Sequence, residues 1–133
     1  MSRRTGRSAA CSFLAACALA AGAPSAQAAF TTTDLPDFNL TGSFASYGGG
    51  TNYYISSGTD GSMSYRWLNS TPYDTVVSGN RCSDLAEFGS HYFNSGVTVY
   101  RTLFVGSSGL CFVVRGKTAG GASMNFYDGR IQR

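Results

Sequence analysis

The sequence predicts an all-β protein, an antiparallel β-sandwich of about seven strands, with a small β-barrel as the alternative. Short runs of β-branched and aromatic residues recur along the chain, separated by turns rich in glycine and serine. Few residues are charged, and no stretch has the apolar spacing of an amphipathic helix of normal length. Together these features favour short paired strands over helices.

Residues 1–28 have the features of a secretory signal peptide. Three arginines precede an alanine-rich apolar stretch, and small residues stand before an expected cleavage site after Ala28. The apolar stretch is too short for a retained membrane span. One alternative is a bacterial lipobox ending at Cys17, which would leave a lipid anchor on that cysteine. The mature protein is therefore expected to be secreted and extracellular, in a bacterial host.

Residues 29–36 are expected to form a mobile arm, and residues 37–133 a single secreted β domain. The ten basic residues include the three arginines of the leader, so those of the mature chain balance its seven acidic residues. A nearly neutral domain gives no electrostatic reason to expect a nucleic acid as partner.

Cys82 and Cys111 are the two cysteines left after cleavage, and they are expected to pair. In an oxidising compartment two cysteines of a small domain usually form a disulfide. A reactive thiol and a metal site are the alternatives, but the chain offers a single histidine as a base or ligand.

The strands are expected where apolar and polar residues alternate. The clearest case is the segment in which Met63, Tyr65 and Trp67 alternate with polar residues. The last strand is expected to contain a bulge at Asp128–Gly129. In chain order, the expected strands are 38–44, 53–55, 62–67, 73–77, 96–105, 110–117 and 122–131.

The strongest local signal is a predicted hairpin over residues 96–117. Two runs of Val, Phe, Tyr, Leu and Thr flank a loop at residues 106–109, which has glycine at both ends. This loop would pair Val105 with Leu110. A short helical turn is expected near 84–88, because Asp84 followed by Glu87 resembles a capping box. The disulfide would hold residues 82–95 over one face of the hairpin, with Leu85, Phe88 and Phe93 filling the space.

No catalytic site is predicted, and the protein is expected not to be an enzyme. His91 and Glu87 would be neighbours on a helical turn, as a small hydrolase would require, but an ordinary capped turn explains them. The aspartates are scattered singly in arms and turns, where they usually bond to the backbone. No cofactor and no metal site are expected, and a calcium site at Asp60 is a lesser alternative.

Four tyrosines in turns or on predicted polar faces are the candidate binding residues. Exposed tyrosines can stack on sugars or anchor a protein interface, although they can also simply cap the edge of a core. We therefore expect a secreted, non-catalytic module that binds an extracellular glycan or protein. The candidate residues are Tyr47, Tyr54, Tyr73 and Tyr92.

Two short segments, 65–67 (Tyr-Arg-Trp) and 109–112 (Gly-Leu-Cys-Phe), resemble the small secreted α-amylase inhibitors of streptomycetes. Those inhibitors are disulfide-bonded sandwiches that use an exposed Trp-Arg-Tyr trio. The trio runs in the opposite order here, and the mature chain has one cysteine pair instead of two. The resemblance implies a secreted inhibitor, or a toxin-like effector of an extracellular protein, as the alternative function.

Overall fold

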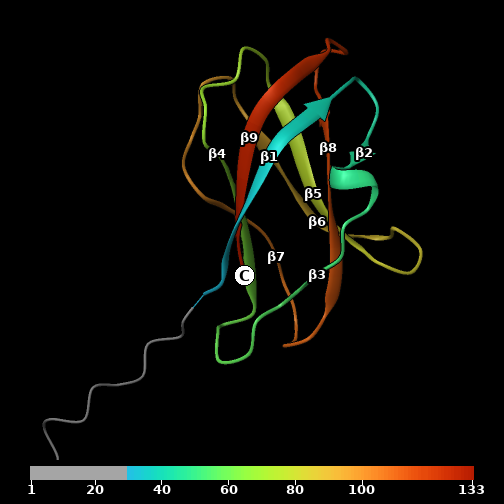
Figure 1. Cartoon of the computed structure of the whole chain (residues 1–133), viewed down its shortest axis with the longest axis vertical. Coiled ribbons are helices and arrows are strands. Elements are labelled where there is room, and N and C mark those ends of the chain that lie inside the picture. The colour runs from blue at the N-terminus through green and yellow to red at the C-terminus, as the bar shows by residue number, and fades with distance from the viewer. Residues whose placement is uncertain (1–29) are drawn as a thin grey trace, which may run out of the picture.

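The computed structural model describes residues 30–133, which form nine strands and one short 3-10 helix (Figure 1). The expected signal peptide and the alternative lipid site at Cys17 lie outside the described residues. Within residues 30–133, the structure contains no helix of the length and apolar character that a membrane span requires. The elements are β1 (Thr32–Leu40), β2 (Ala45–Ser46), η1 (Tyr47–Gly49), β3 (Tyr53–Tyr54), β4 (Ser62–Trp67), β5 (Thr75–Arg81), β6 (Glu87–Phe93), β7 (Arg101–Val105), β8 (Cys111–Thr118) and β9 (Met124–Gln132).

The strands form two antiparallel sheets. The four-stranded sheet has the order β1-β9-β4-β7, and the five-stranded sheet has the order β2-β8-β5-β6 with β3 also paired to β8. Buried apolar side chains from both sheets form one core cluster between them. The predicted antiparallel sandwich is confirmed, and residues 30–133 do not form the single closed sheet of a small barrel.

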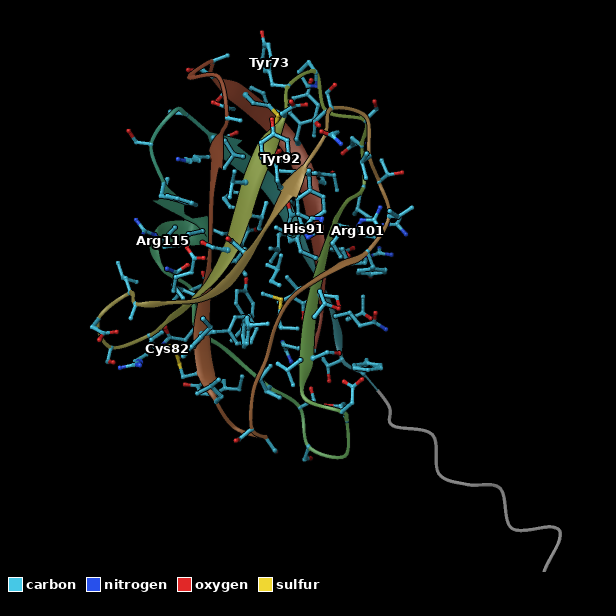
Figure 2. The ribbon with its side chains drawn as sticks, turned by 180° about the vertical axis from the view of Figure 1, so that it is seen from behind. Tyr73, Cys82, His91, Tyr92, Arg101 and Arg115 are labelled. Atoms are coloured by element: carbon cyan, nitrogen blue, oxygen red, sulfur yellow. A yellow bond between two sulfur atoms is a disulfide. The ribbon has the colours of Figure 1, made fainter. Side chains whose placement is uncertain are left out.

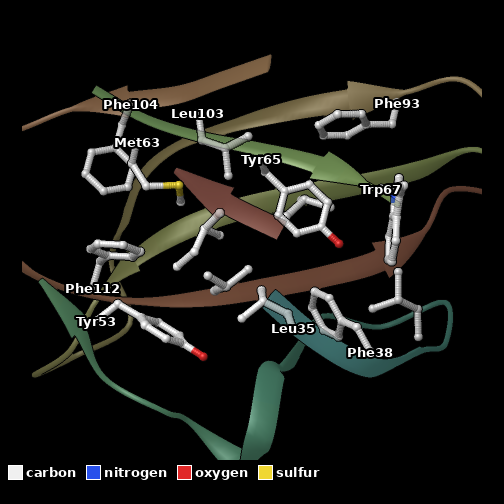
Figure 3. Close-up of a cluster of buried hydrophobic side chains, with 14 of the residues drawn as sticks. Leu35, Phe38, Tyr53, Met63, Tyr65, Trp67, Phe93, Leu103, Phe104 and Phe112 are labelled. Carbon is white, nitrogen blue, oxygen red and sulfur yellow. The ribbon is translucent and has the colours of Figure 1, made fainter. Parts of the chain in front are cut away.

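β4 carries the clearest alternation in the sequence, and the structure confirms it. Met63, Tyr65 and Trp67 are fully buried, while the residues between them are partly exposed (Figure 3). Trp67 donates its indole N–H to the hydroxyl of Thr75 at 2.9 Å, which satisfies its one polar group. Because Tyr65 and Trp67 are buried, they do not form the exposed trio that the resemblance to amylase inhibitors implies.

The predicted hairpin over residues 96–117 is wrong. β7 pairs with β4 in the four-stranded sheet, whereas β8 pairs with β5 in the five-stranded sheet. The loop at residues 106–109 therefore connects the two sheets. Instead of pairing with Val105, Leu110 accepts the backbone N–H of Ile55 at 3.1 Å. The alternating pattern suits either connection, because both strands place one face on the same core.

β1 begins at Thr32, inside the range expected to form a mobile arm. Ahead of it, the N–H groups of Thr31 and Arg133 donate to each other's carbonyl oxygens at 2.7 and 3.0 Å. Leu35 lies opposite Gly129 of β9 and is fully buried. Residues 32–36 are thus part of a paired edge strand, a position that tolerates Pro36 because one side of the strand needs no donor.

Two bulges face one another where β1 pairs with β9. The register shifts by one residue on each strand and then returns. The bulged residues with left-handed backbone are Asp37 in β1 and Phe126 in β9, with φ angles of 54° and 64°. The bulge expected at Asp128–Gly129 therefore lies earlier in β9, because Gly129 pairs in register with both of its neighbouring strands.

Each bulge uses a side chain of the facing strand to bond its backbone N–H. Asp37 donates its N–H to Asp128 Oδ1 at 2.9 Å, and Phe126 donates its N–H to Asn39 Oδ1 at 2.8 Å. These bonds stand in for the interrupted ladder. They hold Phe126 with 77% of its surface exposed, although left-handed backbone is unfavourable for a bulky side chain.

The helical turn expected near 84–88 is wrong. Residues 82–86 form the loop of the β5–β6 hairpin, and β6 begins at Glu87. Asp84 Oδ1 accepts the N–H of Ala86 at 3.1 Å, a local bond whose sequence signature resembles a helix cap. In the described chain the short helical turn is η1, where Gly48 and Gly49 adopt positive φ angles.

Candidate functional site

The four tyrosines predicted to contact a ligand do not form one surface. Tyr73 and Tyr92 lie toward the same end of the molecule, as Figure 2 shows. Tyr54 lies on β3, at the edge of the five-stranded sheet opposite to β6 and Tyr92. Tyr47 is half-buried and donates its hydroxyl to the Pro36 carbonyl at 3.0 Å. Tyr47 therefore holds η1 against β1, while the other three tyrosines are exposed.

Tyr92 is fixed at its polar end by Asp74. Its hydroxyl donates to Asp74 Oδ2 at 2.6 Å, and the N–H of Ser95 donates to Asp74 Oδ1 at 2.7 Å. Both bonds favour the charged carboxylate, so they hold the pKa of Asp74 below its ordinary value of 3.8. The bond to Asp74 also raises the pKa of Tyr92. The ring of Tyr92 is thus held in place while half of the residue stays exposed.

Replacing Tyr92→Phe is expected to raise the pKa of Asp74 toward its ordinary value. The native bond lowers the folded-state pKa, so its stabilising effect is present above the unfolded-state pKa of about 4 and is lost as pH falls through the folded-state value. Carboxyl titration by NMR measures the shift. Urea unfolding of both proteins at pH 7 and pH 2 should show a difference in stability that shrinks at low pH, and a constant difference would contradict this assignment.

The residues that could have formed a catalytic pair are not brought together. Glu87 and His91 lie on β6, where four residues of extended chain separate their Cα atoms by about 13 Å. His91 packs edge-on against Phe93, with ring centroids 5.1 Å apart. Asp60, the alternative calcium ligand, accepts the N–H of Ser62 at 2.9 Å in a turn. Among residues 30–133, no three His, Cys, Asp or Glu side chains are grouped so as to hold a metal ion.

The predicted disulfide between Cys82 and Cys111 is confirmed, with a Cα–Cα distance of 5.7 Å. It joins the end of β5 to the start of β8, beside the last backbone pair of these two strands, Arg81 and Phe112. The bond therefore lies at the base of the loop formed by residues 82–86, here called the disulfide loop. Figure 1 shows this loop projecting from the side of the sandwich.

The disulfide loop is held by four hydrogen bonds. Arg81 donates its N–H to the Ala86 carbonyl at 2.8 Å, and Leu85 donates its N–H to the Arg81 carbonyl at 2.9 Å. Ala86 in turn donates to Asp84 Oδ1. The side chain of Asn80, which is buried, donates to the Leu85 carbonyl at 2.8 Å. The Arg81–Asp84 salt bridge at 3.4 Å is exposed and contributes little, so the backbone bonds and the disulfide fix the loop.

Leu85 lies in this rigid loop in a conformation that leucine disfavours. Its φ is 62°, in the left-handed region, where glycine or asparagine is the usual residue. Leu85 is also 41% exposed, so burial gives only part of its possible stabilisation. Strained residues gather at functional sites, where the surrounding structure imposes the conformation. An exposed apolar side chain on a strained and well-bonded backbone is therefore a candidate binding residue.

The expected cover of one strand face by residues 82–95 is wrong in part. Phe88 packs on Phe104, which lies on the face that was expected to be covered, with ring centroids 5.1 Å apart, but Phe93 is buried in the core. Leu85 was expected to fill space and is exposed instead. Its left-handed backbone depends on how the hairpin loop closes, and no residue type in the loop indicates this conformation.

The comparisons with known proteins do not assign a family. No family model matches the chain, and no curated protein matches it. Among solved structures, the chain is similar to one from the disulfide-linked pili of Bacillus endospore appendages. The TM-score is 0.42 at 10% sequence identity, over 83% of this chain and 94% of that chain. A likeness at this level leaves the ligand of the present chain to be argued from its own residues.

Proposed function

We propose that the mature chain is a secreted, non-catalytic binding domain that docks a protein partner through the disulfide loop. The observation that carries the proposal is Leu85, a leucine that is both exposed and held in left-handed backbone. A rigid loop with an apolar side chain loses little conformational freedom on binding, which favours affinity. A leucine fits an apolar pocket of a protein, whereas it offers a sugar neither a ring to stack on nor a hydrogen bond.

Two further features support this reading. An intramolecular disulfide fits an oxidising compartment, as the signal-peptide pattern of residues 1–28 requires. Glu87 and His91 are held apart on a strand, which favours binding over acid–base chemistry. An inhibitor is one form that a domain of this kind could take, since inhibitors present rigid loops to their targets.

Leu85→Asn is expected to weaken partner binding about tenfold while leaving the fold nearly as stable as before. Asparagine tolerates left-handed backbone, so relief of about 1 kcal/mol of strain offsets the lost burial of the leucine side chain. Thermal unfolding measures the stability. Capture of secreted and cell-surface proteins on the immobilised mature domain identifies the partner, and titration with that purified partner measures the affinity.

Phe126→Asn is the matched control, because Phe126 is also exposed and left-handed but lies on the four-stranded sheet. This variant should keep the affinity of the native protein. The proposal fails if Leu85→Asn binds the purified partner as tightly as the native protein does. It also fails if both variants lose affinity equally, since that would point to a general effect of removing apolar surface.

A further inference from the structure

The outer face of the five-stranded sheet carries two straight rows of side chains. In the first row, Tyr92 of β6, Val76 of β5 and Lys117 of β8 lie directly opposite one another. Phe44 extends this row, because it comes just before Ala45 of β2 and its ring contacts Lys117. The aromatic residues at the two ends are three strand spacings apart, about 14 Å.

The second row runs beside the first and is polar. Ser90, Ser78, Arg115 and Ser46 lie opposite one another across β6, β5, β8 and β2. Ser78 is buried, and its hydroxyl donates to Asn80 Oδ1 at 2.6 Å, so it is not available to a ligand. The other residues of the two rows point away from the core, since the alternate positions of β5 and β8, such as Val77 and Val114, are fully buried. The two rows thus form a flat surface with hydroxyl groups, two cations and an aromatic ring at each end.

The two cations on this surface lack a carboxylate partner. In the part of the chain that the structure describes, salt bridges form at Arg81–Asp84 and at Arg130–Asp34, and neither involves Arg115 or Lys117. Instead, the Lys117 ammonium and the Arg115 guanidinium both lie over the ring of Phe44, 4.9 and 5.7 Å from its centroid. An aromatic ring attracts a cation but does not neutralise it.

The spacing of these cations favours an anionic ligand. Arg115 and Lys117 are two residues apart on one face of β8, so their Cα atoms are about 7 Å apart and their charges repel each other. A carboxylate or sulfate group placed between them would be attracted by both. On the other sheet, the charge of Arg130 is already partnered, because its guanidinium is bonded to Asp34.

We propose that this surface binds an acidic glycan, a polysaccharide that carries carboxylate or sulfate groups. The end rings of Tyr92 and Phe44 can stack on sugar rings, and the hydroxyls of Ser46 and Ser90 can bond to sugar hydroxyls. Arg115 and Lys117 can bind the acid groups. A nearly neutral domain with one such cation pair is poorly suited to the dense charge of a nucleic acid. The surface is separate from the disulfide loop, since Cys111 and Lys117 lie about 20 Å apart along β8.

Affinity electrophoresis of the mature protein tests the proposal with four polymers: polygalacturonate, heparin, neutral dextran and double-stranded DNA. Binding is expected to polygalacturonate, to heparin or to both, which identifies the acid group, and it should weaken as salt is raised. Lys117→Gln should weaken this binding about tenfold. Arg101→Gln removes the same charge from an exposed arginine on the other sheet and should leave binding unchanged (Figure 2).

Lysine-selective acetylation gives a readout that needs no variant. Lys117 is the only lysine of the chain, so its acetylation, followed by mass spectrometry, should slow when the bound polysaccharide covers it. The proposal is overturned if neither acidic polysaccharide binds, if DNA binds as tightly as they do, or if Lys117→Gln and Arg101→Gln lose affinity equally. It is also overturned if Lys117 stays equally reactive in the bound state. None of these results depends on the disulfide loop or on its protein partner.

Discussion

Replacing both half-cystines, Cys82→Ser with Cys111→Ser, is expected to lower the free energy of unfolding by about 3 kcal/mol. The bridge spans 29 residues, so in the unfolded chain it removes the freedom of a long loop. In the folded state the two positions are already neighbours, because β5 and β8 pair up to Arg81 and Phe112. The loss should therefore come mainly from the greater entropy of the unfolded variant. Urea unfolding at pH 7 measures it.

Reduction of the native protein provides the control for this variant, since it breaks the same bond without changing a residue. Both routes should give a similar loss of stability, and a loss below about 1 kcal/mol would contradict the expectation. Hydrogen exchange gives the local test. The N–H groups of Leu85 and Ala86 should lose protection before those of β4 and β9, because the bond anchors the base of the disulfide loop. Uniform loss of protection would contradict a local role.

The sandwich and its core strand could be predicted because both depend on local patterns. In β4, alternation alone places Met63, Tyr65 and Trp67 on one face, and the fold buries that face. The disulfide could be predicted because the expected cleavage after Ala28 would leave two cysteines, and an oxidising compartment would favour their pairing. In each case the residues that determine the structural feature can be identified from the sequence alone.

The connection between β7 and β8 could not be predicted because its cause is not local. A glycine-flanked loop between two apolar strands suits a hairpin within one sheet and a crossing between two sheets equally well. The outcome depends on which partners the strands find, and β7 pairs with β4 while β8 pairs with β5. Such pairings join residues that lie far apart in the sequence, so no short segment of the sequence contains both partners.

The proposed binding surfaces could not be predicted from the sequence for the same reason. Phe44, Val76, Tyr92 and Lys117 become neighbours only through the strand order β2-β8-β5-β6. Of these four residues, Tyr92 alone was a candidate from the sequence, on account of its type. Leu85 shows a second limit, since its left-handed backbone follows from the closure of the hairpin loop and not from leucine's own preference.

Gly89→Ala is expected to lower the free energy of unfolding by about 3 kcal/mol. Gly89 lies on β6, and a Cβ atom built there would stand 2.1 Å from the Leu103 carbonyl oxygen and 3.1 Å from Phe104 Cβ. The first of these atoms belongs to the backbone of β7, so it cannot move unless the whole strand shifts. The methyl group would therefore push apart the edge strands of the two sheets, β6 and β7.

Gly120→Ala is the matched control, because nothing lies within 4 Å of a Cβ atom at Gly120. It should change the stability by less than about 0.5 kcal/mol. The comparison tests how closely β6 packs against β7. In this contact each edge strand shields the other from pairing with a strand of a second molecule. Opening the contact should also raise aggregation, which light scattering of Gly89→Ala near its unfolding temperature would detect. If the two alanine variants are equally stable, β6 and β7 do not pack as closely as the structure has them, and the unpaired edge of β6 must be protected in another way.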